Sequence, residues 1–469
     1  MKFKFEKLGL LDEAELELAD LTIICGENNS GKTYATYAVY GFLRSWRRLL
    51  RAELMSLIKS ADSAVEQGYQ FDLKEIFSGK LNAYLEKVCK RYVNQLPDVF
   101  AANPVYFEST QIQVTILESV DFTQTAFERP IKSGPDGKVL ATISKEKGSD
   151  LLKVLIADDG LDIWALSEFF SDAIAEIVFA PYLPNTFIAS AERTGAAIFL
   201  KELDFARTGM VEALRTLDAK ELQKNPFLLH QRMQAGSDSY AWPVRDNVDF
   251  IRQLEDFDKD IGELASKTPA LLTSFDALIG GSYKVIKDRG LVYKPKGNGK
   301  PSFSMGESSS CVRALLDIGF YLRCKAKAGD VFIIDEPELN LHPKNQRALA
   351  RLIARMVNAG VKVFVTTHSD YLVKEFNTLI MLAQKTLHTK AMQSKYKYDQ
   401  DELLDSERIK LYMTGIKTKP ARGEVKASKI NTLIPALINS DYGIEVTTFD
   451  TTIEEMNTIQ SDIIYGGEL

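Results

Sequence analysis

The sequence predicts an α/β fold with a mixed central sheet flanked by helices and a large, mainly helical insertion. Three short apolar runs favour the sheet: LTIIC at residues 21–25, VFIID at 331–335 and VFVTT at 363–367. Each run is continuous, as is typical of inner strands that are buried on both faces. About 270 residues lie between the turn after the first run and the helix before the second, which predicts the insertion.

Extended and helical segments alternate along the rest of the chain. Residues 2–25 are predicted to be strands, because Phe3 and Phe5 alternate with lysines and the later leucines alternate with glutamates. The segments after them are predicted as helices at about 34–58 and 72–95, strands and turns over 103–147, helices at about 164–178, 195–224 and 244–280, a hairpin over 282–295, and helices at about 307–327 and 343–359.

The composition is that of a folded protein without a strong charge bias. The chain has 469 residues, of which 45% are hydrophobic and 26% charged, and its length suggests about three structural units. A net charge of -6 gives no general attraction to nucleic acid or anionic membranes, although a local basic surface is compatible with it. The four cysteines form no C-x-x-C pair and indicate reduced thiols. No apolar run reaches about 18 residues, so we expect a cytoplasmic protein with no membrane partner.

The segment GENNSGKT at residues 26–33 is the strongest chemical signal. Its spacing, G-x-x-x-x-G-K-[ST], directly after an apolar strand and before a helix, is that of the phosphate-binding loop of a P-loop NTPase. Its glycines let backbone N–H groups face the β-phosphate, and the helix N-terminus adds a positive dipole. Lys32 should reach the β- and γ-phosphates, and the Thr33 hydroxyl should bind Mg²⁺. The predicted nucleotide-binding residues of this loop are Gly26, Asn28, Asn29, Ser30, Gly31, Lys32 and Thr33.

A second motif, VFIIDEPELNLHP at residues 331–343, ends an inner strand with two carboxylates. Asp335 is placed to hold Mg²⁺, as in other P-loop enzymes. Glu336 points to the opposite side of the strand end, which suits a general base for the attacking water. A buried strand can end in Asp-Glu-Pro simply as a turn, but a phosphate-binding loop on the same chain favours the catalytic interpretation.

Two further segments have both a structural and a functional interpretation. His368 follows the third apolar run and is either a hydrogen-bonded structural residue or, as we favour, a sensor of the γ-phosphate. The segment FSMGESSSCVRAL at residues 303–315 begins a helix, and its serines and Glu307 could serve only as an N-cap. Its position before the second apolar run also suits an anion at the helix start, next to Ser304 and Gly306.

In this order, GENNSGKT, SMGES, VFIIDEPELNLHP and VFVTTHS resemble the motifs of the ABC-type head ATPases of the SMC, RecF and OLD-nuclease superfamily. The chain is also similar to stand-alone ATPases of bacterial anti-phage systems, such as the subunits of PARIS and Septu. The motif-bearing match covers roughly residues 1–40 and 282–375. Residues 182–195 resemble the segment of these ATPases that returns to the head before the long insertion.

The resemblance implies an ABC-type ATPase head that binds ATP and Mg²⁺ and dimerises on ATP. Ser304 and Gly306 would then contact the γ-phosphate of ATP on the other subunit, and residues 340–342 (Asn340, Leu341 and His342) would form the D-loop. The implied partners are a second copy in an ATP-sandwich dimer or a higher homo-oligomer, and a separate effector such as a nuclease. The pattern departs from the family twice: the signature is SMGES instead of SGGQ, and no Q-loop glutamine is evident, so Glu192 or Arg193 would have to take that role.

These motifs predict four regions along the chain. Residues 1–40 and 282–400 form the two lobes of the head, residues 41–281 form inserted helical and α/β subdomains within which 182–200 return to the head, and residues 401–469 form a small C-terminal α/β appendage that completes the head. The insertion has no sustained heptads, which excludes a long coiled-coil arm.

Two charged segments bear on nucleic acid. One helix carries four closely spaced arginines, which are either a contact for phosphate backbones or, as we favour, a solvated or ion-paired face; they are Arg44, Arg47, Arg48 and Arg51. In the tail, Asp399 and Asp401 follow no apolar strand, so we expect no metal-dependent nuclease centre on this chain.

The favoured function is an ATP-hydrolysing switch that dimerises on ATP and scaffolds or controls an effector in anti-phage defence. The alternative is a DNA-repair or DNA-end-binding ATPase of the RecF or SMC type, so direct binding of nucleic acid stays open. A small-molecule P-loop kinase or a GTPase is disfavoured, because no N-K-x-D guanine motif is present.

Overall fold

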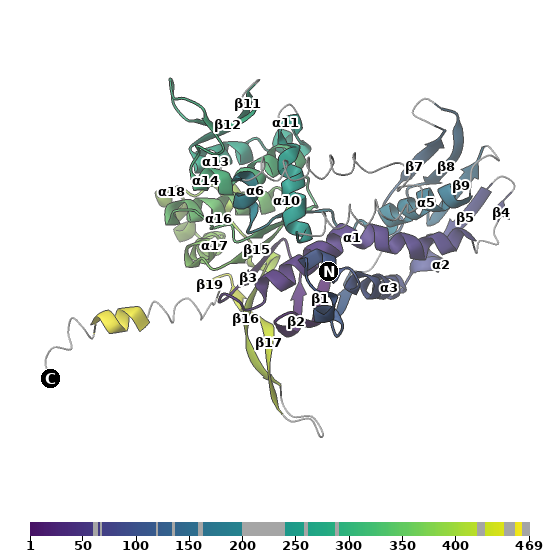
Figure 1. Cartoon of the computed structure of the whole chain (residues 1–469), viewed down its shortest axis with the longest axis horizontal. Coiled ribbons are helices and arrows are strands. Elements are labelled where there is room, and N and C mark those ends of the chain that lie inside the picture. The colour runs from purple at the N-terminus through teal and green to yellow at the C-terminus, as the bar shows by residue number, and fades with distance from the viewer. Residues whose placement is uncertain are drawn as a thin grey trace, which may run out of the picture.

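A six-stranded sheet forms the centre of the computed structural model, which describes residues 1–59, 64–65, 68–118, 121–133, 137–157, 163–198, 240–257, 261–286, 290–419, 427–444 and 455–461. The strand order is β10-β14-β15-β3-β16-β17 (Figure 1). The strands are β10 (Thr186–Ala189), β14 (Val331–Asp335), β15 (Lys362–Thr367), β3 (Leu21–Cys25), β16 (Ile409–Lys419) and β17 (Ser428–Pro435). All neighbours are parallel except β16 and β17, which confirms the predicted mixed sheet.

Helices cover both faces of this sheet. In chain order, the head contains α1 (Lys32–Lys59), α6 (Arg193–Ile198), α10 (Trp242–Arg252), α11 (Leu254–Phe257), α12 (Glu263–Lys267), α13 (Ala270–Ile279), α14 (Ser310–Ala314), α15 (Leu316–Phe320), the π-helical turn η3 (Tyr321–Lys325), α16 (Pro343–Asn358), α17 (Asp370–Leu382), α18 (Leu387–Tyr396) and the short turns η4 (Gln400–Glu402) and η5 (Ser406–Arg408).

The inner strands are apolar throughout because each face of the sheet has its own core. Every residue of β14 is buried. Val331 and Ile333 belong to the core that contains the apolar side chains of α1. Phe332 and Ile334 belong to the other core, which contains those of α13, α16 and α17. This alternation is the period of two of a strand, so a continuous apolar run is what two covered faces require.

Three smaller sheets adjoin the central one. Their strands are β1 (Lys2–Leu8), β2 (Leu11–Glu17) and β6 (Gln111–Thr115) in the order β2-β1-β6; β11 (Gly281–Ile286), β12 (Gly290–Pro295) and β13 (Phe303–Ser304) in the order β11-β12-β13; and the pair β18 (Ile438–Asn439) and β19 (Gly443–Ile444). The β11–β12 hairpin agrees with the one predicted over residues 282–295.

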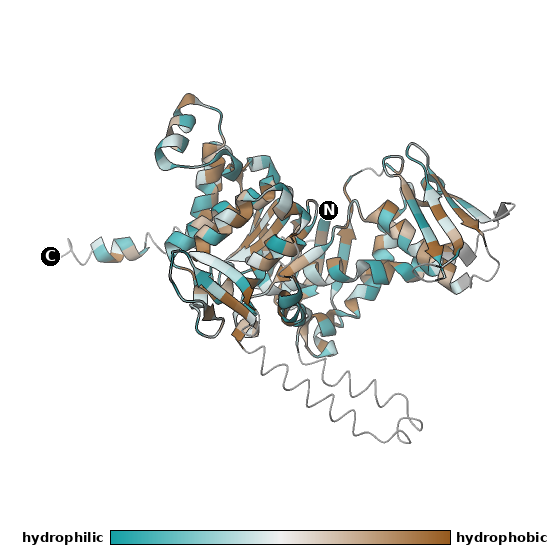
Figure 2. Cartoon of the chain, turned by 90° about the horizontal axis from the view of Figure 1, so that it is seen from above, coloured by the Kyte–Doolittle hydropathy of each residue, from teal (hydrophilic) through white to brown (hydrophobic). Residues whose placement is uncertain are grey.

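The chain between α1 and β10 packs along the length of α1, with a second sheet and α5 at the far end of that helix (Figures 1 and 2). It contains β4 (Ala64–Val65), β5 (Gly68–Asp72), β7 (Phe127–Lys132), β8 (Val139–Lys145), β9 (Leu151–Ile156), α2 (Leu73–Phe77), α3 (Leu81–Val93), α4 (Leu96–Phe100), η1 (Pro104–Phe107), α5 (Ile163–Ile174) and the π-helical turn η2 (Ala175–Phe179). Its antiparallel sheet has the order β4-β5-β9-β8-β7.

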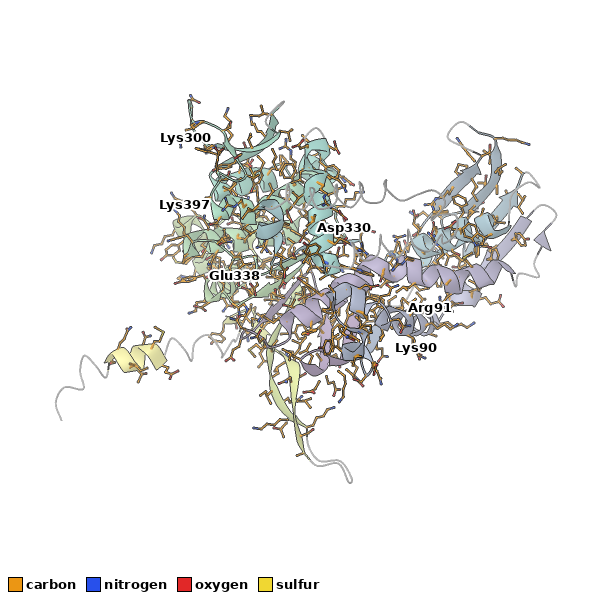
Figure 3. The ribbon with its side chains drawn as sticks, viewed as in Figure 1. Lys90, Arg91, Lys300, Asp330, Glu338 and Lys397 are labelled. Atoms are coloured by element: carbon orange, nitrogen blue, oxygen red, sulfur yellow. The ribbon has the colours of Figure 1, made fainter. Side chains whose placement is uncertain are left out.

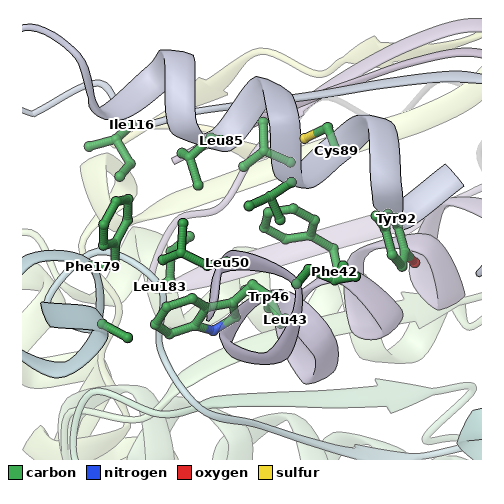
Figure 4. Close-up of a cluster of buried hydrophobic side chains, with 14 of the residues drawn as sticks. Phe42, Leu43, Trp46, Leu50, Leu85, Cys89, Tyr92, Ile116, Phe179 and Leu183 are labelled. Carbon is green, nitrogen blue, oxygen red and sulfur yellow. The ribbon is translucent and has the colours of Figure 1, made fainter. Parts of the chain in front are cut away.

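The long helix α1 connects this unit to the head through one continuous core. Phe42 and Trp46 of α1 pack with Leu85 and Tyr92 of α3, next to Phe179 (Figure 4). The Phe42 and Tyr92 rings meet edge to face, with centroids 5.7 Å apart, an arrangement that aromatic quadrupoles favour. The helix therefore belongs to both parts.

Several predicted boundaries differ from the structure. The boundary after residue 40 falls inside α1, and strand β6 of the predicted insertion over 41–281 pairs with β1 of the head. Strand β10, which pairs with β14, lies within the segment 182–200 that was predicted to return to the head. Residues 409–435 of the appendage predicted to complete the head provide β16 and β17 of the central sheet itself. These segments join the head because strand pairing is non-local and leaves little trace in local sequence.

Some predicted helices are shorter or interrupted. The helix predicted at 72–95 is divided into α2 and α3 at Gly79, whose φ of +69° is left-handed. The helix predicted at 307–327 begins at Ser310 and is divided at Leu315. Most of the helix predicted at 195–224 lies outside the described residues. Within them, none of the helices has the length and apolar character needed to cross a bilayer.

Candidate nucleotide-binding site

The candidate site lies at one edge of the central sheet, where β3, β14 and β15 end. These strands are parallel and adjacent, so their carboxyl ends meet at the same edge, which we call the nucleotide edge. It presents the loop of residues 26–33 after β3, Asp335 and Glu336 at the end of β14, and His368 just after β15. Ligands of open α/β sheets bind outside the carboxyl ends of the strands.

The loop of residues 26–33 needs its glycines for space and for conformation. Gly26 has a φ of +143° and Gly31 a φ of +99°, which side chains rarely adopt. A Cβ on Gly26 would lie 1.9 Å from Thr414 Oγ1, and one on Gly31 would lie 2.8 Å from the Leu11 side chain. Thr414 Oγ1 also donates a hydrogen bond of 2.7 Å to Ser30 Oγ. Strand β16, which local sequence did not connect to this loop, therefore packs directly against it.

Lys32 points back into the loop from the first turn of α1. Its Nζ donates to Gly26 O at 3.1 Å and Glu27 O at 2.6 Å, and the side chain is 5% exposed. Burial lowers the pKa of this lysine, whereas the carboxylates of Glu336 and Asp335 raise it. The charged ammonium is thus held near the positions where phosphates would lie, with backbone carbonyls as its present partners.

Thr33 and Asp335 fit a Mg²⁺ ion by their chemistry. Thr33 is exposed at the second position of α1, and Asp335 is 2% exposed at the end of β14. Burial raises the pKa of Asp335 to about 6, and a hydrogen bond from the Thr366 hydroxyl opposes this. The described residues contain no cluster of three metal-binding side chains. Hydroxyl, carboxylate, phosphate and water oxygens are what Mg²⁺ takes at nucleotide sites, so the Thr33 hydroxyl and the Asp335 carboxylate suit that ion.

Glu336 and His368 contact each other across the nucleotide edge. Glu336 Oε1 lies 3.3 Å from His368 Nε2, and this contact lowers the pKa of the glutamate. Glu336 has a φ of +49°, which is uncommon for a residue with a Cβ. Its backbone N–H donates to the Thr366 carbonyl and hydroxyl oxygens at 3.2 and 3.1 Å. The carboxylate is therefore ionised near neutral pH and held by neighbours on β15.

Glu338 is a further carboxylate at this edge that was not identified from the sequence. Its Oε1 accepts hydrogen bonds from the His368 backbone N–H at 2.6 Å and from the Thr367 hydroxyl at 2.8 Å. Its Oε2 is buried and has no hydrogen-bond partner among the described residues, and burial raises its pKa. The repeated acid in the sequence DEPE was the available signal. Glu338 fixes the start of the His368 loop.

The segment after β10 supplies two charged residues with different roles. Glu192 accepts a hydrogen bond of 2.9 Å from the Tyr37 hydroxyl. Arg193 is only 1% exposed, and its guanidinium donates to the carbonyls of Asp335 and Glu336 at 2.7 and 2.9 Å. The sequence left open which of the two takes the place of a Q-loop glutamine. Arg193 contacts the backbone of the catalytic segment, whereas Glu192 presents a carboxylate.

Residues 304–309, which we call the signature turn, contain Ser304 and Gly306 and lead from β13 into α14. The Ser304 N–H and hydroxyl both donate to the Glu307 carboxylate, at 2.9 and 2.8 Å. Ser309 caps α14 by accepting from Val312 N–H. Gly306, Glu307 and Ser309 are exposed. The turn is thus locally closed and its outer side faces solvent. The anion contact of Ser304 and Gly306 across a dimer stays a prediction.

The three predicted D-loop residues are placed by the start of α16. Asn340 has a φ of +61°, Leu341 is buried, and His342 is the N-cap of α16. His342 Nδ1 accepts a hydrogen bond of 3.2 Å from Lys344 N–H. His342 therefore has a structural contact in this chain, and a role across an interface stays a prediction.

Both charged segments singled out in the sequence are engaged within the chain. Arg44 pairs with Asp246 and Arg51 with Glu168 and Asp172, which agrees with the ion-paired interpretation of that helix. Arg47 and Arg48 lie over the rings of Trp46 and Trp242. In the tail, Arg355 pairs with both Asp399 and Asp401. These ion pairs give both aspartates a structural role in the described chain.

The strand order, the glycine loop after β3 and the acidic end of β14 define a P-loop NTPase fold. Residues 214–374 match the family described as "AAA domain, putative AbiEii toxin, Type IV TA system". No curated protein matches the chain. Among solved structures, the chain is similar to the Smc head domain with an extended coiled coil bound to the C-terminal domain of ScpA from Pyrococcus furiosus, with 13% identity, 98% of each chain covered and a TM-score of 0.29.

Two other solved structures are similar at the same low level. One is the SmcHead bound to the C-winged helix domain of ScpA, with 11% identity, 92% of this chain and 98% of that chain covered, and a TM-score of 0.33. The other is the SMC head domain from Thermotoga maritima, with 10% identity, coverage of 92% and 97%, and a TM-score of 0.28.

Proposed function

We propose that this chain is an ATP-binding and ATP-hydrolysing switch of the ABC type, which dimerises on ATP and controls a separate effector protein. The observation that carries the proposal is the meeting of loop 26–33, Asp335 and the Glu336–His368 pair at one edge of one sheet. A phosphate-binding loop, an ion-holding carboxylate and a base next to a histidine are the groups that hydrolysis of a γ-phosphate needs.

Each residue of the edge has a chemical task in this proposal. Lys32 exchanges its two loop carbonyls for phosphate oxygens. Thr33 and Asp335 would hold Mg²⁺, which would neutralise phosphate charge. Glu336 accepts the proton of the attacking water, which its lowered pKa permits at neutral pH. His368, next to it, orients that carboxylate and faces the γ-phosphate.

The exposed signature turn supports the proposed dimer. The outer side of the turn that contains Ser304 and Gly306 faces solvent and is accessible to a second chain. The resemblance to ABC-type heads would place the turn of one chain on the ATP bound at loop 26–33 of the other. Asn340 and His342 of the predicted D-loop would lie at the dimer interface, between the two composite sites.

We expect complementation between two inactive variants. Ser304→Arg blocks the signature turn and Lys32→Ala blocks phosphate binding, so each variant alone should be inactive as a dimer. In a mixed dimer, one composite site keeps Lys32 from one chain and Ser304 from the other. ATP hydrolysis by the mixture should then exceed that of either parent, as measured by phosphate release.

Co-assembly has to be established in the same mixture by light scattering with Mg-ATP. Mixed dimers that form but release no more phosphate than the parents would contradict the composite site. A matched control is Ser394→Arg, at an exposed position of α18, which should leave activity unchanged in homodimers.

The effector and the role in anti-phage defence rest on the sequence resemblance. The match to a domain described as a putative AbiEii toxin is compatible with them. Cleavage of nucleic acid would belong to a partner polypeptide, because Asp399 and Asp401 are engaged by Arg355. Purification from the native host through an affinity tag, with and without Mg-ATP, identifies such a partner and its dependence on closure.

One surface favours direct binding of nucleic acid as the second candidate function. Four exposed lysines line an open pocket with a volume of about 860 Å³, which forms a concave surface beside the β11–β12 hairpin. No carboxylate in the described part of the chain forms an ion pair with them, although Asp276 lines the same surface; they are Lys284, Lys294, Lys296 and Lys300. Unpaired ammonium groups of this kind suit the phosphates of a nucleic acid backbone.

Binding of duplex DNA at this surface should be steeply salt-dependent. Each phosphate contact contributes about 0.9 to the slope of log K against log salt. The double variant Lys294→Ala/Lys300→Ala should therefore lower the slope by up to about 1.8, as measured by fluorescence anisotropy. Lys90→Ala is the control, because Lys90 lies on α3, far from Lys300 (Figure 3), and is paired with Glu86. Equal slopes for all three proteins would exclude the surface.

A further inference from the structure

Two arginines connect the signature turn to the catalytic segment inside one chain. The first is Arg313, in the last turn of α14. Its guanidinium donates to the carbonyls of Met305, Gly306 and Ser308, at 3.3 Å for the first two. These three carbonyls belong to the signature turn. Arg313 therefore holds the turn as one body with α14.

The second arginine, Arg193, contacts the residue that directly follows Arg313. Its Nε donates to Ala314 O at 2.7 Å, the carbonyl that follows Arg313 in the chain. Its other nitrogens donate to Ser190 O at 2.9 Å and to the carbonyls of Asp335 and Glu336. One rigid guanidinium thus joins the end of β10, the end of α14 and the end of β14. An arginine is suited to this because its planar fork fixes several donors at once.

This connection reaches Glu336, the proposed general base, whose backbone has an uncommon positive φ. The positive φ of Glu336 is held on one side by Thr366, which accepts from its N–H, and on the other by Arg193, which donates to its carbonyl. A shift of α14 moves Ala314 O, and with it the guanidinium and the Glu336 peptide. Since interiors are close-packed, such a shift is transmitted as a body and is not absorbed locally.

The surroundings of Arg193 indicate that its guanidinium is placed for hydrogen bonds to backbone carbonyls and not for a hydrogen-bonded ion pair. Asp317 is 1% exposed, and neither of its carboxylate oxygens has a hydrogen-bond partner among the described residues. Burial raises the pKa of Asp317 to about 7, which the charge of Arg193 opposes. The guanidinium therefore directs its donors to four backbone carbonyls although a carboxyl group lies nearby.

We propose that Arg313 and Arg193 are positioning residues that couple the two ATP sites of the dimer. The inference rests on the proposed function, in which the signature turn of one chain closes on the ATP of its partner. That closure would move α14 and, through the two arginines, bring Glu336 of the same chain into position on its own ATP. A chain whose signature turn faces an empty partner site would then hydrolyse its own ATP slowly.

A mixed dimer tests this directly. Wild-type chains are mixed with a large excess of Lys32→Ala chains, so that only the wild-type chain holds ATP and its signature turn faces an empty site. The measured quantity is the coupling ratio: the single-turnover rate per loaded site in the wild-type homodimer divided by that in the mixed dimer. We expect a ratio of about fivefold or more, the usual lower range of coupling between sites.

The arginine variants should abolish the ratio. Both Arg193→Lys and Arg313→Lys keep the charge. The first loses the fork of donors, and the second loses the Nη1 that makes all three hydrogen bonds of Arg313, so both homodimers should turn over slowly and their coupling ratio should approach one. ATP affinity should stay unchanged, because neither arginine contacts loop 26–33. Arg408→Lys is the control: Arg408 also joins separate segments, through Asp20, Asn358 and Val357 O, but at the opposite edge of the sheet. It should keep the wild-type ratio.

The outcomes separate this inference from the proposed function. If the arginines have a purely structural role, their variants should be less stable to heat and should slow the homodimer and the mixed dimer equally. The coupling ratio would then equal the wild-type ratio, and that result would overturn the proposed coupling. A wild-type ratio near one, in dimers that form and hydrolyse ATP, would also overturn it while the dimer stands. Absence of ATP-dependent dimers or of any hydrolysis would instead refute the proposed function. If Arg193→Lys does not fold, the half-buried Arg313→Lys gives the same test.

Discussion

Replacing Glu336 by glutamine should stop ATP turnover while leaving ATP binding intact. The amide keeps the size of the side chain but cannot accept a proton from water, and loss of a general base typically costs about 10²- to 10⁴-fold in rate. In the structure the Glu336 carboxylate lies 3.3 Å from His368 Nε2, and this contact lowers its pKa, so the group is ionised near neutral pH and able to accept a proton. Phosphate release under saturating Mg-ATP measures the loss.

The same variant should accumulate in the closed, ATP-loaded dimer. If closure is driven by ATP and released by hydrolysis, as we propose, blocking the chemical step shifts the population toward the dimer. Bound ATP also stabilises the fold by mass action, by about 2.7 kcal/mol at a ligand concentration of 100 times Kd. Size-exclusion chromatography with light scattering, and thermal melting with and without Mg-ATP, measure both effects.

A matched control distinguishes the base from a carboxylate that is only structural. Glu402→Gln makes the same change at a buried glutamate that pairs with Arg351 and Arg355, outside the nucleotide edge. It should lose stability but keep turnover. Turnover at the wild-type rate in Glu336→Gln would show that Glu336 is a strand-end carboxylate, and the buried Glu338 would become the next candidate for the base.

Replacing Lys32 by alanine should remove nucleotide binding. The ammonium lies inside loop 26–33, where phosphates would replace its two carbonyl partners. Truncating one member of a buried charge pair costs about 2–5 kcal/mol, which corresponds to a loss of roughly 30-fold or more in affinity. Isothermal titration with a non-hydrolysable ATP analogue measures the change.

Lys145→Ala is the control for Lys32→Ala. Lys145 is a second buried lysine, and its Nζ donates to two backbone carbonyls, Thr125 O at 2.6 Å and Glu146 O at 3.3 Å. It lies in β8 of the five-stranded sheet, away from the nucleotide edge. Its loss should reduce stability without changing ATP affinity. An unchanged affinity in Lys32→Ala would show that GENNSGKT is not the site.

Local sequence was sufficient to predict those parts of the site whose structure is determined by one short, continuous segment. The loop of residues 26–33 and the strand before it form a contiguous pattern of apolar run, glycine and lysine. The two acids at the end of VFIID likewise follow a run that can only be an inner strand. Each motif follows the end of an inner strand. Because these strands are parallel, their ends lie at the same edge of the sheet, so the sequence also predicted that the motifs meet there.

Tertiary structure alone decided which distant segments support that edge. Thr414 meets Gly26 because β16 pairs with β3, although almost 400 residues separate them. Arg193 joins β14 to α14 because β10 lies beside β14. Neither pairing leaves a local periodicity, since strand pairing across long loops depends on burial of whole faces. For the same reason the head takes in β6 and β16–β17, which local patterns assign to an insertion and an appendage.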